Sequence, residues 1–203
     1  MTTHYDYLSL TLARGAAAWS DFARQVRETA APAARAAGGA VVGLFQGQLG
    51  FASDEAVLLL RGSDGGQDWA RAPGVAAVTR ETLTPTVRPA DDAVLKPGGI
   101  YVHRWFTVDG AAVAEFIALS NQAWEGFEGG FDTQIFGLFA AAPSDEDRRA
   151  GAGRLLLLTW YASHGVWEAS RSQTRDPAGL FVRRDKLTRS TIGRSSLSVS
   201  LAG

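Results

Sequence analysis

The clearest pattern in the chain is a nine-residue segment, 100–108, in which β-branched and aromatic residues alternate. Such alternation is typical of a β-strand, because successive side chains of a strand point to opposite faces. One face would carry Ile100, Val102, Arg104, Phe106 and Val108, and the other Tyr101, His103, Trp105 and Thr107. The pattern predicts a strand that packs on helices with its aliphatic face and borders a ligand space with its aromatic and polar face.

The same order of landmarks occurs twice along the chain, which indicates a tandem duplication. The matched landmarks are Tyr-x-Tyr at 5–7 and Tyr-x-His at 101–103, Gly-Leu-Phe at 43–45 and 137–139, Leu-Leu-Leu at 58–60 and 156–158, and Trp69 and Trp167. Tryptophan is rare, so its recurrence after each leucine run carries weight. We therefore expect a first repeat over residues 1–88, a linker over 89–99 and a second repeat over 100–203.

Each half predicts the order strand, helix, strand, strand, helix, strand. In the first half the strands are expected at 5–12, 40–46, 56–61 and 78–87, with one helix from about residue 19 to 30, closed by Pro32 and Gly38-Gly39, and a short one around Trp69. In the second half the strands are expected at 100–108, 133–140, 154–161 and within 187–201. The helices there should begin at the N-caps Asp109 and Ser163, and residues 143–149 form a charged loop or a turn of helix.

This order of elements predicts an α+β fold of two tandem ferredoxin-like βαββαβ repeats. Each repeat would be a four-stranded antiparallel sheet with both helices on one face, which leaves the other face bare. Pairing the two bare faces within one chain would bury them and enclose a space, as an intrachain α–β barrel. The aromatic and polar faces of the strands at 5–12 and 100–108 would then line that space.

The landmarks also resemble those of a known family. The strand with Tyr101 and His103, the helix with Phe116 and Trp124, Gly-Leu-Phe and the segment 158–163 look like NIPSNAP-type domains of the dimeric α–β barrel superfamily. The resemblance covers both halves, more clearly 99–192, and implies a ferredoxin-like fold without an established chemistry. Members of the wider group include cofactor-independent monooxygenases, isomerases, haem-binding and haem-degrading enzymes, and proteins of no known activity. A tandem duplication departs from the usual single-copy proteins of the family and argues against ordinary homodimerisation, so a homo-oligomer stays only an alternative.

Composition narrows the classes of function. The 20 basic and 21 acidic residues are scattered along the chain, so we expect no nucleic-acid partner. The absence of cysteine excludes disulfides, thiolate nucleophiles and zinc–thiolate sites. No apolar run approaches the roughly 18 residues that a membrane span needs, and the N-terminus lacks the pattern of a signal peptide. A cytoplasmic protein without a membrane partner is expected.

Two histidines and two arginines are the candidates for chemistry. His103, on the aromatic face of its strand, is the best catalytic candidate, as a base or as a group that orients a ligand; the alternative is a histidine hydrogen-bonded within the sheet. His164 follows the end of a strand, where loop residues often line the mouth of a site; the alternative is an exposed residue in the first turn of a helix. Arg80 and Arg189 occupy matching Thr-Arg positions and would clamp a carboxylate if they point inward, or protect a sheet edge if they point outward. No carboxylate lies at metal-ligand spacing from either histidine, so no metal is expected.

Three functions follow as hypotheses. The first is an α–β barrel protein that binds a small aromatic or apolar ligand between its sheets without a cofactor, whether or not it is an enzyme. The second is a cofactor-independent monooxygenase or isomerase that acts on an aromatic, acid-bearing substrate, with His103 as base and Arg189 as anchor. The third is a haem protein with His103 or His164 as axial ligand. Thirteen of the 20 aromatic residues follow residue 99, which favours a pocket in the second half. The expected ligand-binding residues are Tyr7, Tyr101, His103, Trp105, Tyr161 and Arg189.

Overall fold

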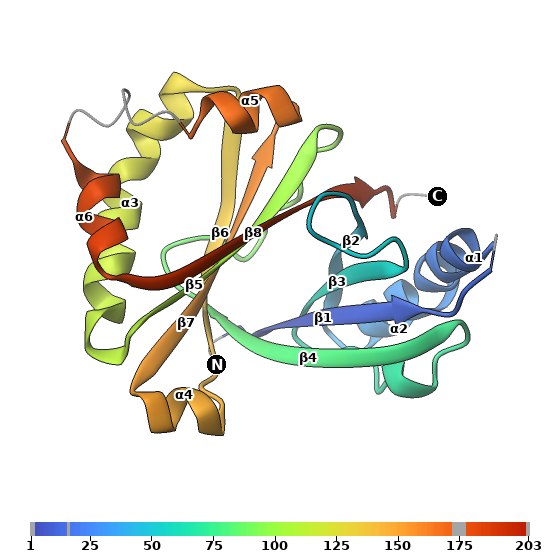
Figure 1. Cartoon of the computed structure of the whole chain (residues 1–203). Helices are drawn as coiled ribbons and strands as arrows, with labels where there is room; N and C mark the ends of the chain where they lie inside the picture. Colours follow the sequence, from blue (N-terminus) through green and yellow to red (C-terminus); the bar gives the residue numbers. More distant parts are fainter. Residues whose placement is uncertain (1–2, 16, 172–177, 202–203) are drawn as a thin grey trace. The chain divides into compact units, whose positions relative to one another are not determined.

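The computed structural model describes residues 3–15, 17–171 and 178–201 (Figure 1). The chain divides into two compact units, of which unit 1 comprises Met1–Thr84 with Ser195–Gly203 and unit 2 comprises Pro85–Arg194. The described residues form an α+β fold with eight strands, as expected. None of the helices in these residues is both long and apolar enough to cross a membrane.

Unit 1 contains most of the first predicted repeat. Its elements are β1 (Tyr5–Leu12), α1 (Ala18–Gln25), the π-helical turn η1 (Val26–Ala30), α2 (Ala31–Ala36), β2 (Ala40–Gly47), β3 (Glu55–Arg61), the 3-10 turn η2 (Trp69–Arg71) and β4 (Val75–Pro85). The strands are antiparallel in the order β4-β1-β3-β2, the order of a ferredoxin-like sheet. Residues 196–199, the end of β8, pair with the outer edge of β2.

The core of unit 1 follows the predicted alternation. Leu8, Leu10 and Leu12 are buried in one cluster with Phe22 of α1 and with Trp69. The leucine face of β1 therefore packs on the helices, as its sequence predicts.

Unit 2 contains most of the second predicted repeat. Its elements are β5 (Ile100–Asp109), the 3-10 turn η3 (Gly110–Ala112), α3 (Val113–Gly130), β6 (Thr133–Ala141), α4 (Asp145–Ala150), β7 (Ala152–Tyr161), α5 (His164–Ala169), α6 (Leu180–Lys186) and the first part of β8 (Thr188–Val199). The strand order is β8-β5-β7-β6, again the ferredoxin-like order. On the outer edge of β6, the amide of Thr86 donates to the carbonyl of Leu138 at 3.0 Å, and the amide of Leu138 donates to the carbonyl of Arg88 at 3.1 Å.

Helices α3 and α6 lie side by side over one face of the unit 2 sheet (Figure 1). Between them and the sheet lies a core in which the rings of Phe106 and Phe116 are 4.8 Å apart, with Leu138 and Leu155 beside them. This face is the aliphatic face of β5, so its orientation toward the helices agrees with the sequence.

Several local expectations need correction. Pro32 does not close the first helix, which runs on to Ala36 and ends before Gly38 and Gly39, the other predicted end. The π-helical turn precedes α2, and Pro32 lies at the start of that helix, where its missing N–H matters least. Only a single 3-10 turn forms around Trp69. Asp109 makes no side-chain cap, because its carboxylate accepts from the Nε of Arg189 at 2.8 Å.

In the second half, the cap of α5 agrees with the prediction and helix α6 was not predicted. Ser163 caps α5 as predicted, since its hydroxyl accepts from the amide of Val166 at 3.2 Å. The charged segment forms α4, closed at its N-terminus by a capping box between Ser144 and Asp147. Helix α6 was not expected, because its seven residues show no clear helical period. It becomes important below, because it forms one wall of a cavity.

The duplication and the face-to-face pairing of the two sheets stay predictions. The compact units differ from the predicted repeats, 1–88 and 100–203, in that Ser195–Gly203 belongs to unit 1. The reason is local, since residues 196–199 pair with β2 of that unit.

Candidate functional site

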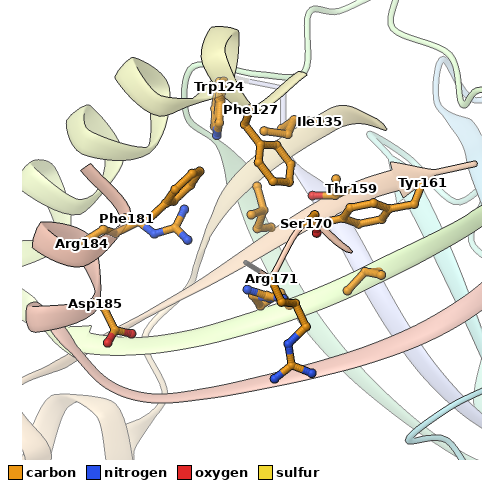
Figure 2. A pocket seen from close by; sticks show the side chains of 13 residues that line it. Trp124, Phe127, Ile135, Thr159, Tyr161, Ser170, Arg171, Phe181, Arg184 and Asp185 are labelled. Carbon is orange, nitrogen blue, oxygen red and sulfur yellow. The ribbon is translucent and has the colours of Figure 1, made fainter. Parts of the chain in front are cut away.

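A cavity of about 300 Å³ lies in unit 2 between the sheet and helices α3 and α6 (Figure 2). The strands contribute Val102, Arg104, Ile135, Leu157, Thr159 and Tyr161 to its lining, the helices contribute Trp124, Phe127, Phe181, Arg184 and Asp185, and the segment after α5 contributes Ser170 and Arg171. The cavity combines aromatic rings, hydroxyl groups and cations, a mixture typical of small-molecule sites.

Regular periodicity brings these side chains together. Val102 and Arg104 are two residues apart on β5, so both point to the helix face. Trp124 and Phe127 are three apart on α3, and Phe181 and Arg184 are three apart on α6, so each pair shares one side of its helix. Figure 2 shows Trp124 and Phe127 reaching the cavity from α3, with Phe181 and Arg184 entering from α6.

Arg184 is unusual because only 8 % of it is exposed. Its guanidinium carbon lies 5.1 Å from the ring centre of Phe106, 5.4 Å from that of Phe116 and 5.0 Å from that of Phe181. A cation over aromatic faces is attracted by their quadrupoles, and this attraction partly replaces the lost hydration. The three rings thus hold a permanent positive charge beside the cavity.

Arg104 and Arg184 also act on Tyr161. Burial raises the pKa of its hydroxyl, although the charges of Arg104 and Arg184 and a hydrogen bond with Ser170 act in the opposite direction. The phenol therefore stays protonated at neutral pH and can donate a hydrogen bond. The charges of Arg104 and Arg184 therefore both act on the Tyr161 hydroxyl.

Aromatic rings form the rest of the wall. Phe127 meets Tyr161 edge to face at 6.3 Å and Phe181 at 5.6 Å between ring centres. Trp124 is almost fully buried, and its Nε1 has no hydrogen-bond partner among the described residues. An unpaired N–H at a cavity is a donor that a ligand can satisfy.

Of the six residues expected to bind a ligand, Tyr161 alone lines this cavity. Tyr101 and His103 are buried on the opposite face of β5, where the Tyr101 hydroxyl donates to the carbonyl of Lys96 at 3.0 Å. Trp105 is half-buried on that face, with the Arg154 guanidinium 5.7 Å from its ring. Tyr7 is buried in β1 of unit 1.

Arg189 points to the surface. Its guanidinium pairs with the exposed carboxylate of Asp109 and donates from Nη1 to the carbonyl of Ala150 at 2.9 Å. The Arg189 side chain therefore points to solvent, away from the cavity. Its counterpart Arg80 is also ion-paired, with Asp6 and Asp64.

His103 has 0 % exposure. Burial, with a contribution from the charge of Arg194, lowers the pKa of His103 to about 3. An imidazole with this pKa is neutral at pH 7 and is a weak base there. Its catalytic role stays a prediction, to which this environment lends no support.

The residues that sequence reasoning missed are Arg104, Trp124, Phe127, Phe181 and Arg184. One signal was visible, since Arg104 interrupts an otherwise aliphatic strand face, where an arginine is rarely buried without a reason. The others look like ordinary core residues, or lie in a helix that the sequence did not predict. Across residues 3–15, 17–171 and 178–201 no group of three His, Asp or Glu side chains could hold a metal ion.

The comparisons with known proteins identify the fold. No family model matches the chain, and no curated protein matches it. Among solved structures it is similar to an anthrone oxidase-like protein, with a TM-score of 0.62 and 11 % identity over 97 % of this chain and 92 % of that one. It is also similar to a ferredoxin fold protein from Listeria monocytogenes related to antibiotic biosynthesis monooxygenases, with a TM-score of 0.52 and 9 % identity over 98 % and 96 % of the two chains.

A third similar structure is a haem-binding protein from Thermus thermophilus, with a TM-score of 0.57 and 10 % identity over 99 % of this chain and 93 % of that one. These structural neighbours are ferredoxin-like proteins of the dimeric α–β barrel class. At such low identity they show the fold alone. The narrower NIPSNAP resemblance stays a prediction.

Proposed function

We propose that the chain is a cofactor-independent monooxygenase of the dimeric α–β barrel type, and that it binds a small aromatic substrate in the unit 2 cavity. The observation that carries this proposal is the cavity itself, where aromatic walls surround two arginines and a protonated tyrosine. Two of the structural neighbours described above are named as an anthrone oxidase-like protein and as a relative of antibiotic biosynthesis monooxygenases, which supports the same class.

The reaction needs no cofactor when the substrate supplies the electrons. A methylene group flanked by phenolic rings loses a proton to give a delocalised carbanion. This anion passes one electron to O₂, the two radicals combine as a peroxide, and loss of water leaves a carbonyl group. One oxygen atom enters the substrate and the other leaves as water, so R₂CH₂ and O₂ become R₂C=O and H₂O.

Such chemistry asks the protein to stabilise an anion and to exclude water. The positive charges of Arg104 and Arg184 stabilise the deprotonated substrate, and aromatic side chains line the space around them. Tyr161 donates a hydrogen bond to the developing oxyanion. We assign proton removal to Asp185, since it is the carboxylate among the described residues of the lining.

The proposal places the substrate on the helix face of the unit 2 sheet. The earlier expectation of a small aromatic or apolar ligand held between the sheets near His103, with or without catalysis, stays an untested alternative. A haem at the cavity has little support, because neither His103 nor His164 lines it and burial keeps Tyr161 protonated. Homo-oligomerisation and a cytoplasmic location also stay predictions.

The test is oxygen uptake with 1,8-dihydroxyanthrone as probe. The wild-type chain should consume one O₂ per quinone formed, faster than the spontaneous oxidation of the probe, with one ¹⁸O atom in the product and no added cofactor. Thr159→Leu should lower the rate at least tenfold, because it fills the cavity from β7 while preserving the apolar core around it.

The control variant is Arg189→Leu, which removes a unit 2 arginine from the surface and should keep the wild-type rate. A wild-type rate equal to that of the probe alone would refute the activity. An unchanged rate in Thr159→Leu would show that the reaction takes place elsewhere in the molecule.

A further inference from the structure

We infer that the cavity selects aromatic anions, that Arg104, Arg184 and Trp124 hold the acid group of the ligand, and that the chain has one such site, in unit 2. This inference rests on the proposed function in so far as the same cavity is the binding site. It adds the charge of the ligand and the number of sites, neither of which the fold determines.

Unit 1 serves as an internal comparison. When Tyr5 and Tyr7 are aligned with Tyr101 and His103, Leu8 falls at the position of Arg104. The partners of these two residues are Leu58 of β3 and Leu157 of β7. Strand pairing therefore shifts the matched leucine runs, 58–60 and 156–158, by one residue relative to each other.

The neighbouring pair gives the same result. Asp6 pairs with Leu60 in unit 1, and Val102 pairs with Thr159 in unit 2, so Leu60 falls at the position of Thr159. Leu8 and Leu60 are both fully buried in their core. The same sheet order is therefore built with leucine at both positions, so the fold does not require Arg104 and Thr159.

In unit 1 an arginine near the first residues of β1 is paired with two carboxylates of the same unit. Arg80 lies 3.4 Å from the carboxylate of Asp6 and 2.7 Å from that of Asp64. The adjacent loop packs closely on α2, because a Cβ on Gly65 would lie 2.8 Å from the backbone of Ala33. This end of unit 1 is thus occupied by its own loop and its own ion pairs.

The unit 2 cavity has the opposite charge balance. Its described lining carries Arg104, Arg171 and Arg184 against a single carboxylate, Asp185. Arg184 is held among three phenylalanine rings. An arginine on the surface could instead turn its guanidinium to solvent. A buried guanidinium is stabilised by an anion, and its planar fork fits a carboxylate.

Trp124 supplies an independent observation. Its Nε1 is buried at the cavity without a hydrogen-bond partner in the described chain, and Figure 2 shows the nitrogen edge of the indole on the side of the cavity. A buried N–H is normally paired, so this donor is one that a bound acceptor would complete. The anchor therefore consists of donors alone, which favours a negatively charged acceptor.

The cavity has room for a ring system beside the anchor. A cavity of about 150 Å³ accommodates benzene, and this one has about 300 Å³. A fused two-ring acid therefore fits, with its rings against Phe127 and Phe181. We choose 2-naphthoate as the probe and 2-naphthamide as its neutral analogue of nearly the same shape.

The experiment is a calorimetric titration of the full chain with both probes at pH 7. Wild type should bind one naphthoate per chain, at least tenfold more tightly than the amide. Arg104→Leu, which installs the residue found at the matching position of unit 1, should weaken naphthoate binding at least tenfold and amide binding less than threefold. Arg189→Leu, a surface arginine of the same unit, should bind both probes like wild type.

The outcomes separate this inference from the proposed function. Equal affinity of wild type for the two probes would overturn the anion anchor, and two naphthoates per chain would overturn the single site. Binding of neither probe would overturn the inference, and oxygen uptake with the anthrone would then decide the proposed function by itself. The comparison of two probes on wild type requires no variant, so it holds even if Arg104→Leu fails to fold.

Discussion

His103→Gln is expected to change how stability depends on pH. Burial holds the pKa of this imidazole at about 3 in the folded chain, whereas the pKa of an unfolded histidine is about 6.5. Between about pH 3 and pH 6.5, His103 is protonated in the unfolded state and neutral in the folded state. The free energy of unfolding therefore falls as the pH falls below about 6.5, and stability from this group is complete above that pH.

The size of the effect follows from the two pKa values. At pH 5 the unfolded imidazole is mostly protonated, which stabilises the unfolded state by about 2 kcal/mol relative to pH 7. Folded protein gains almost nothing over this interval. His103→Gln keeps a neutral polar side chain of similar volume and removes the titration, so the variant should lose about 2 kcal/mol less than wild type between pH 7 and pH 5.

Urea unfolding of both proteins at a series of pH values between 7 and 5 gives the comparison. Carboxylates such as Asp64 and Asp147, whose pKa values are also lowered, titrate in both proteins and cancel in the difference. His164→Gln controls for the loss of a histidine as such. Parallel pH curves for wild type and His103→Gln would refute the reasoning, because they would mean that the folded protein accepts the proton on His103.

Two further predictions concern stability. Trp69→Ala should lower the free energy of unfolding by about 3–5 kcal/mol, because Trp69 has 3 % exposure in the unit 1 core; Trp167, which is only partly buried, should lose less when replaced by alanine, and equal losses in urea unfolding would contradict this ranking. Asp147→Asn should cost about 1–2 kcal/mol, since this carboxylate closes the capping box with Ser144 and pairs with Arg154 at 2.9 Å. Burial raises the pKa of Asp147, but the hydrogen bonds from Ser144 and Arg154 outweigh it and lower the pKa, so this difference from wild type should shrink as the pH falls below about 4. A difference that is independent of pH in thermal unfolding would show that the charge of Asp147 is unimportant.

The elements that the sequence predicted well are those with a strict period. Strand β1 spans Tyr5–Leu12 as expected, because its leucines alternate without interruption. Ser163 caps α5 because a hydroxyl before a short helix satisfies an amide that has no other partner. Both signals are local, so they need no knowledge of the rest of the chain.

Helix α6 shows where local signals fail. Its seven residues are too few to be a stable helix alone, and packing against α3 supports them. Without α6 the sequence could not indicate Phe181 or Arg184, and hence could not indicate the positively charged wall of the cavity.

The sequence by itself determined which side chains share a strand face. It placed Arg104 with Val102 and Phe106, and it placed His103 with Tyr101 on the opposite side, and the structure confirms both groupings. Periodicity is enough for this, because the backbone of a strand directs alternate side chains to opposite faces.

Only the tertiary structure shows the cavity over the helix face of the unit 2 sheet. The aromatic and polar face looked like the ligand side, and that expectation stays a prediction, with Tyr101 and His103 buried there. The cavity lies on the other face, where Trp124 of α3 and Arg184 of α6 leave a space over β5 and β7. A void depends on how the volumes of side chains from several elements add up at one place, and no single segment of sequence contains that sum.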